Sequence, residues 1–344
     1  MAYFFIGLLM FLFTSLEQLK YNKVFSRIFL GIFTFILILF VGLRDGTSVG
    51  TDSPTYYANY LYKFWEVEYG YKFLNEFFST NDVNYNIFLI FINTISLFNI
   101  SKFIKYNSPF FVIPLFIYFS DFFLYYNFSG IRQAMALSFT ALSVNYTLQD
   151  KKIKAFFLIV FGAFFHITAL IFLASLIMPT KRMTSKNYIT FLLIILIGTL
   201  VSNYLIENIE YLRYKFMYYS EWQEKSDNIF TSYIIGALKR LIILGGVFAV
   251  RATFFKVDRN TFLFNIYLVG LIIYLATYLI SPDFGVRFST YFTVMDCVIV
   301  GNILFLAKKS STKFIWYFIF VIMAMYKVST YSQLPSYQYN LYTK

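Results

Sequence analysis

Three arginines at the ends of apolar segments are the positions where this sequence could bind an anion. Arg44 ends the second apolar segment, and Arg132, followed by Gln133, begins the fifth. Arg287 begins a later one, after the turn at residues 281–286. Arginine donates two parallel hydrogen bonds from a planar group that keeps its charge, which suits phosphate and diphosphate. We therefore predict a diphosphate site. The alternative is that each arginine only anchors its helix at the membrane surface.

Two residues could act as a general base beside such a site. Asp52 lies in a polar stretch after Gly50, and His166, the only histidine, lies within a long apolar segment. Either group could take a proton from a sugar hydroxyl at about 3 Å. The alternatives are an aspartate that only forms a turn and a histidine that only makes a structural hydrogen bond. The sequence leaves the choice between Asp52 and His166 open.

Charged residues also lie inside apolar segments, as Lys239 and Arg240 do. An ionisable group at the bilayer centre costs about 2.5–3.5 kcal/mol, so it usually faces a cavity or a partner. We expect Asp121 and Asp296 to be such partners for basic residues in the bundle. The aromatic-rich stretch 56–78 suits either stacking on sugar rings or an interfacial aromatic belt.

The composition defines the class of protein that positions these residues. The chain has 344 residues, of which 59% are hydrophobic and 13% charged, against about 25% charged in soluble proteins. This excludes a soluble domain, a disordered protein and a nucleic-acid-binding protein, despite the net charge of +12. One histidine and one cysteine exclude a disulfide framework and argue against a metal site.

Apolar segments recur along the whole chain, and a helix needs about 20 residues to span a membrane. We predict an all-α polytopic bundle of about 10–11 transmembrane segments. We interpret the first apolar segment as a membrane span and not as a cleavable signal peptide. The bundle forms a single membrane domain, residues 1–344, with outer loops at 44–84 and 207–230. The segments lie near 3–16, 28–43, 85–100, 109–126, 130–148, 155–178, 188–206, 231–250, 261–280, 288–306 and 314–328.

Lysine and arginine residues predict the orientation, because cytoplasmic loops hold the excess of positive charge. Three early connections are basic and are expected on the cytoplasmic side. They are 17–27, 101–108 and 149–154. If every later segment, including 155–178, crossed the membrane, many of the later basic residues would lie on the outer side.

A re-entrant segment at 155–178 restores the charge bias. Two half-helices of about 11–12 residues, each about 18 Å long, would enter the bilayer and return without crossing it. Their tip would lie near His166, where irregular backbone is tolerated only if protein or a cavity surrounds it. Both termini then lie outside. Labelling of a cysteine at Ser185 from outside would contradict this arrangement.

These residues resemble the EpsG family within the Wzy-type polysaccharide polymerases. The resemblance rests on short motifs, in order, over most of the chain. They are Leu43-Arg44 with residues 49–52 and Tyr56/Tyr57, residues 131–136, Lys151-Lys152, residues 165–170 and residues 287–292. The stretch that corresponds to residues 44–48 is more compact in the family pattern. This difference loosens the match of Asp52 to the family motif.

The resemblance implies an integral-membrane glycosyltransferase of the GT-C type, active at the outer face of the inner (plasma) membrane. Donor and acceptor would be undecaprenyl-diphosphate-linked glycans, joined into O-antigen, capsule or exopolysaccharide without metal or cofactor. A chain-length regulator is an expected partner, besides membrane lipid. The catalytic candidates are Asp52, His166, Arg132 and Arg287. The substrate-binding candidates are Arg44, Gln133, Arg240, Lys239, Tyr57 and Tyr291.

Other activities would use a similar set of residues. A flippase for the same glycan predicts internal repeats and a central charged path, whereas the polar residues gather outside and no repeat is evident. A ligase that transfers finished glycan to another lipid shares nearly the same chemistry and is not separated by sequence. A membrane acyltransferase needs a second acid or base near its histidine, and none is obvious.

Overall fold

A computed structural model describes residues 1–64, 66–208, 210 and 229–342. These residues are helical and contain no strand, apart from an isolated bridge between Arg44 and Leu341. The first helices are α1 (Ala2–Leu19), α2 (Lys23–Gly42), α3 (Ser53–Tyr62), α4 (Tyr69–Thr80), α5 (Tyr85–Asn107), α6 (Val112–Tyr118), the π-helix η1 (Phe119–Asn127), α7 (Ile131–Thr147) and α8 (Lys152–Ala163). The remaining helices are the 3₁₀-helix η2 (Ile167–Ile177), α9 (Ser185–Asn208), α11 (Ile229–Ala249), α12 (Arg251–Phe254), α13 (Asp258–Thr277), α14 (Pro282–Thr293), α15 (Asp296–Leu306), α16 (Ser310–Gln333) and the 3₁₀-helix η3 (Pro335–Tyr337).

The protein is a polytopic helical membrane protein. Among the described residues, six helices are long and apolar enough to cross a membrane: α1, α2, α5, α11, α13 and α16. The pair α14–α15, bent by 45°, makes a seventh if it is one broken span. The other segments expected from the sequence form shorter helices, namely α6 with η1, α7, α8, η2 and the apolar part of α9.

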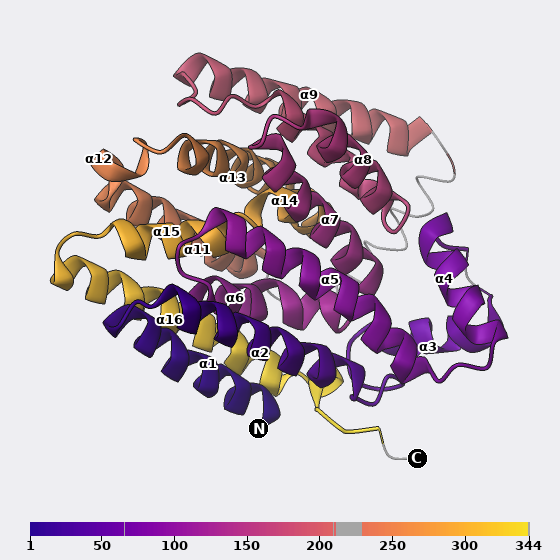
Figure 1. Ribbon diagram of the computed structural model, residues 1–344. Helices are drawn as coiled ribbons and strands as arrows, with labels where there is room; N and C mark the ends of the chain where they lie inside the picture. Colours follow the sequence, from indigo (N-terminus) through magenta and orange to yellow (C-terminus); the bar gives the residue numbers. More distant parts are fainter. Residues whose placement is uncertain (65, 209, 211–228, 343–344) are drawn as a thin grey trace.

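The helices run between two ends of the bundle (Figure 1). At the first end, the rings of Tyr3 and Tyr339 lie 6.0 Å apart, and Arg44 pairs with Leu341. Both termini therefore lie at this end, together with α3 and α4, and we call it the terminal end. At the opposite end, the Asn107 side chain donates to Asn145 at 2.6 Å, which joins the ends of α5 and α7.

The segment 155–178 is a hairpin, as the sequence predicted. α8 packs against η2, and the chain reverses around His166, whose backbone is extended (φ −155°). After η2, the carbonyl of Pro179 accepts a hydrogen bond from Asn265 in α13. Arg259 at the start of α13 binds the carbonyl of Tyr106 at the opposite end. Both feet of the hairpin thus lie at the opposite end, and its tip points toward the terminal end.

The segment between α2 and α5 supports the tip of this hairpin. The amide of Gly70, in the first turn of α4, donates to the carbonyl of Phe164 at 2.8 Å. A Cβ at Gly70 would lie 2.8 Å from that carbonyl oxygen, so the two chains approach closely. The amide of Ile167 donates to the Glu68 carboxylate at 3.4 Å. These bonds satisfy backbone groups that the break between α8 and η2 leaves without helical partners.

Side-chain caps fix other helix ends. Asn22 accepts hydrogen bonds from Val24 and Phe25 at the start of α2, as asparagine commonly does at helix N-termini. The buried Glu17 carboxylate in α1 accepts from the amides of Phe111 (2.7 Å) and Ile113 (3.1 Å) at the start of α6. A negative charge is favourable there because the helix N-terminus is partly positive.

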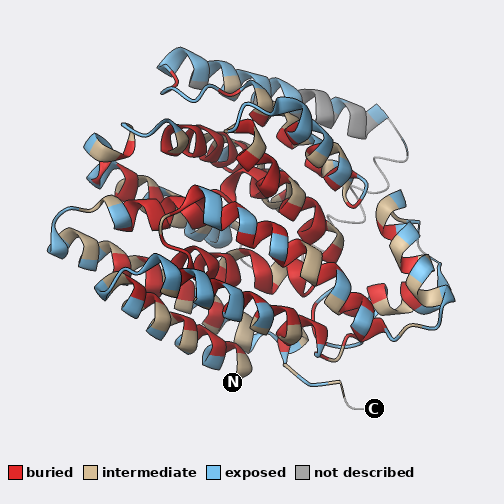
Figure 2. Cartoon of the chain, viewed as in Figure 1, coloured by how far each residue is buried: buried red, intermediate tan, exposed pale blue. Residues whose placement is uncertain are grey.

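Burial separates the centre of the bundle from its outer helices (Figure 2). Most residues of α6, α7, α13 and α15 are buried. The outer helices α1, α11 and α16 expose many large apolar side chains, as expected of surfaces that face acyl chains. The predicted outer loop 44–84 contains α3 and α4, whereas most of the predicted loop 207–230 lies outside the described residues.

Candidate functional site

Arg132 is at the centre of a polar cluster at the terminal end of the bundle. It lies in the first turn of α7, and its Nη1 forms an ion pair with Glu68, just before α4. Its Nε donates to the Tyr56 hydroxyl of α3 at 3.0 Å, and the guanidinium carbon lies 5.7 Å from the centre of the Tyr56 ring. Helices α3, α4 and α7 therefore meet at this guanidinium.

His166 joins the same cluster from the tip of the hairpin. Its Nδ1 lies 3.2 Å from Glu68 Oε1 and 3.4 Å from the hydroxyl of Thr168. The Thr168 hydroxyl is also 2.9 Å from the hydroxyl of Tyr291 in α14. The hairpin thus brings the histidine between the α3–α4 segment and α14.

Arg287 and Asp52 complete the cluster. Gln133 donates to the backbone carbonyl of Arg287 at 3.3 Å, which ties the start of α7 to α14. The Arg287 side chain lies 3.5 Å from Asp283 and remains 30% exposed. Asp52, at the start of α3, is exposed and lies within electrostatic range of both Arg287 and Arg132. Both arginines therefore lie near the same accessible carboxylate.

The two carboxylates of the cluster differ in their electrostatics. Desolvation raises the pKa of Asp52, and Arg287 and Arg132 oppose that effect. Burial acts against the charged form of Glu68 as well, but its bonds to His166 and the charge of Arg132 outweigh burial and lower its pKa to about 2. Glu68 is therefore a permanent anion between the arginine and the histidine at neutral pH.

Six of the residues singled out in the sequence come together in this cluster. They are Asp52, Arg132, Gln133, His166, Arg287 and Tyr291. Their elements are far apart along the chain, so the bundle itself creates the site. The roles assigned to them remain predictions.

Arg44 does not belong to this site, contrary to the prediction. The side chain is 1% exposed and donates from Nε to Val49 (3.0 Å), and from Nη1 to Val41 (2.6 Å). Its Nη2 donates to the Phe128 carbonyl (2.7 Å) and to Ser53. These partners occupy the guanidinium, which holds the chain between α2 and α3 against the turn before α7.

Lys239 and Arg240 contact other groups than those of the Arg132 cluster. Lys239 lies 2.7 Å from Asp121 in η1 and 3.2 Å from Asp296 in α15, inside the bundle. The expectation that both aspartates pair with a basic residue is confirmed. The guanidinium carbon of Arg240 lies 3.7 Å from the centre of the Tyr274 ring. Arg240 also lies within electrostatic range of Tyr126, as Arg287 does, so its predicted role in substrate binding stays a prediction.

The described aromatic side chains of the stretch 56–78 divide between packed and exposed rings. The ring of Tyr57 lies 5.3 Å from that of Tyr85, so this candidate packs on α5. Tyr60 and Tyr71 are buried, whereas Tyr62 and Tyr69 are exposed. Only the exposed rings are placed to meet a ligand at the surface.

Sequence reasoning missed Glu68 and Thr168. Glu68 is one of several acidic residues between α2 and α5, and nothing in its neighbours distinguishes it from Glu66 or Glu76. Its role follows from the turn before α4, which places it beside the hairpin. Thr168 lies two residues after His166, and that proximity was the available signal.

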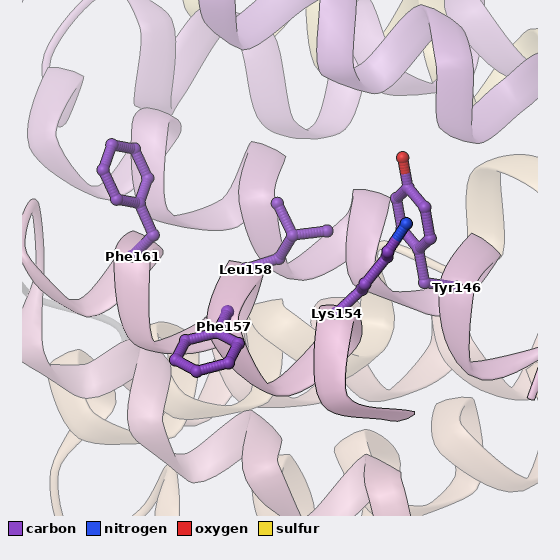
Figure 3. A pocket seen from close by; sticks show the side chains of 5 residues that line it. All are labelled: Tyr146, Lys154, Phe157, Leu158 and Phe161. Atoms are coloured by element: carbon purple, nitrogen blue, oxygen red, sulfur yellow. The ribbon is translucent and has the colours of Figure 1, made fainter. Parts of the chain in front are cut away.

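The part of the chain that the structure describes contains no group of three or more His, Cys, Asp or Glu side chains suited to a metal ion. A shallow apolar hollow between α7 and α8 is lined by Tyr146, Lys154, Phe157, Leu158 and Phe161 (Figure 3). It contains no residue of the Arg132 cluster.

The fold and the cluster define a polytopic membrane protein with an arginine- and carboxylate-containing site at one end of its bundle. Residues 27–343 match the EpsG family, and the chain belongs to it. This is a family of polysaccharide polymerase-like membrane proteins. No curated protein and no solved structure matches the chain significantly.

Proposed function

We propose that this protein polymerises undecaprenyl-diphosphate-linked oligosaccharide repeat units into O-antigen, capsule or exopolysaccharide. The observation that supports this most is that Arg132 and Arg287 both lie within electrostatic range of the exposed Asp52. Two guanidinium groups can hold the oxygens of a lipid diphosphate, and an accessible carboxylate can orient a sugar hydroxyl. Family membership supports the same chemistry.

In the proposed reaction, a hydroxyl of the incoming repeat unit attacks the anomeric carbon of the growing glycan. A new C–O bond forms as the bond from that carbon to the lipid diphosphate breaks, and the diphosphate leaves with the electron pair. Arg132 and Arg287 stabilise the negative charge that develops on the leaving group. Asp52 or His166 accepts the hydroxyl proton.

The proposed arrangement is of the GT-C type, with the site at the outer face of the inner membrane. The lipid tails of donor and acceptor stay in the bilayer while their sugars meet at the end of the bundle. A chain-length regulator is a proposed partner. The basic connections at the opposite end support this orientation, since positive loops favour the cytoplasm.

The test is to incubate purified protein in liposomes with one lipid-linked repeat unit and to separate the products by size. A ladder of products is expected. One transfer only would indicate a ligase, and no product would favour a flippase.

A variant pair tests the diphosphate site in the same assay. Arg132→Ala should slow polymerisation by about 10²–10³-fold and leave single repeat units. The matched control is Arg251→Gln, which removes an exposed arginine in α12 at the opposite end. Normal chain length in Arg132→Ala would refute the assignment.

A further inference from the structure

One carboxylate connects the two groups most suited to chemistry in the cluster. Glu68 Oε1 lies 3.2 Å from His166 Nδ1, while Oε2 pairs with Arg132. Oε1 also accepts from the amide of Ile167, at the tip of the hairpin. The carboxylate is therefore fixed from two sides, and its position relative to the imidazole is set by the fold.

The surroundings of the imidazole leave its other nitrogen available. Within the described residues, the hydrogen bonds of the ring involve Nδ1 alone, with Glu68 and Thr168 as partners. His166 is 13% exposed and lies between two helices of the hairpin, outside the spanning helices. A carboxylate at Nδ1 favours the tautomer with the proton on Nδ1 and a lone pair on Nε2.

We propose that Glu68 is a positioning residue that holds His166 with a basic Nε2, and that His166, rather than Asp52, takes the proton of the acceptor hydroxyl. This inference rests on the proposed function. The hydroxyl proton moves to Nε2, and the oxygen's electron pair forms the glycosidic bond. The lipid diphosphate leaves, and the resulting imidazolium is stabilised by the Glu68 carboxylate before it releases its proton to water.

The two candidate bases differ in their surroundings. Arg287 and Arg132 stabilise the Asp52 anion, but burial outweighs them and raises the pKa of Asp52. Burial lowers the pKa of His166, and together with Arg132 and Arg287 it outweighs the opposing effect of Glu68. The assignment to His166 therefore rests on geometry, since Glu68 lies 3.2 Å from Nδ1, where it fixes the ring and stabilises the imidazolium.

The only histidine of the chain makes the positioning directly measurable. Nitrogen and carbon NMR of histidine-labelled protein reports the tautomer and pKa of His166 alone. Wild type should show the proton on Nδ1. Glu68→Gln should lower the His166 pKa by about 1 pH unit or more. Glu66→Gln, an exposed glutamate two residues away, should leave it unchanged. An equal pKa in wild type and Glu68→Gln would overturn the positioning role.

Polymerisation kinetics test whether His166 acts as the base and whether Glu68 supports it. Glu68→Gln should reduce kcat by about 10²-fold and shift the acidic limb of the pH–rate profile downward, and Glu68→Asp should restore part of the activity. Glu68→Gln in a His166→Gln background should cost little more, because the two residues act as a unit.

Two results would separate the possible failures. Additive losses in the double variant, or a change in KM alone, would overturn the proposal and indicate that Glu68 acts only through Arg132. If wild type makes no polymer, the proposed function and the catalytic role of His166 fail together. The NMR result then still decides whether Glu68 fixes the imidazole.

Discussion

Replacing Arg44 by methionine should unfold the protein at a lower temperature, because this arginine is structural. Its guanidinium is 1% exposed and lies 4.8 Å from the centre of the Phe128 ring. It supplies hydrogen bonds to the carbonyl oxygens of Val41, Val49 and Phe128. Methionine keeps much of the volume but removes these three bonds, and the Ser53 hydroxyl remains as the other donor to the Val49 and Phe128 carbonyls.

The magnitude follows from these bonds. A hydrogen bond from a charged donor contributes about 1.5–3 kcal/mol, so losing three with partial compensation costs about 4–6 kcal/mol. For a chain of this length we expect the unfolding midpoint to fall by about 5 °C or more. Arg132→Met, at a partly exposed guanidinium in the site, should shift the midpoint by less than about 2 °C while abolishing polymer.

The chain provides its own probe for this comparison. Cys297 is the only cysteine and is buried, so a thiol-reactive dye becomes fluorescent when heating exposes it. Arg44→Met should react at lower temperature than wild type, and Arg132→Met should not. If Arg44→Met unfolded like wild type and yet made no polymer, Arg44 would belong to the site and its structural assignment would be wrong.

Two further substitutions test the packing around the site. Gly70→Val places side-chain atoms against the Phe164 carbonyl, so it should displace α4 from the hairpin and reduce polymerisation at least tenfold; circular dichroism should show unchanged helix content. Lys239→Met leaves Asp121 and Asp296 without their cation and should cost about 3–5 kcal/mol by thermal unfolding. Replacing both aspartates by asparagine in that background should recover stability, and no recovery would contradict the ion-pair assignment.

Sequence patterns predicted the helical framework well because membrane insertion imposes strong rules. Apolar length located the helices that now appear as α1, α2, α5, α11, α13 and α16. Charge bias located the hairpin at 155–178, including its turn at His166. Both patterns reflect the cost of placing polar backbone or charge in hydrocarbon, a constraint that acts on the chain locally.

The site was only partly predictable, because side-chain partners depend on contacts distant in sequence. Arg44 and Arg132 look alike, as arginines beside Gly-containing turns at segment ends. They differ because the Arg44 side chain turns toward backbone carbonyls, whereas Arg132 meets Glu68. Glu68 reaches Arg132 only because of the turn before α4, and the two residues are 64 positions apart in sequence. No periodic sequence pattern links residues so far apart.

Binding of undecaprenyl diphosphate to the purified protein is the most direct test of the central claim, that Arg132 and Arg287 together hold a lipid diphosphate. Wild type and the Arg251→Gln control should bind with similar affinity. Arg132→Gln and Arg287→Gln should each weaken binding at least tenfold. Equal affinity in all four proteins would contradict the account, because the two guanidinium groups would then not form the diphosphate site.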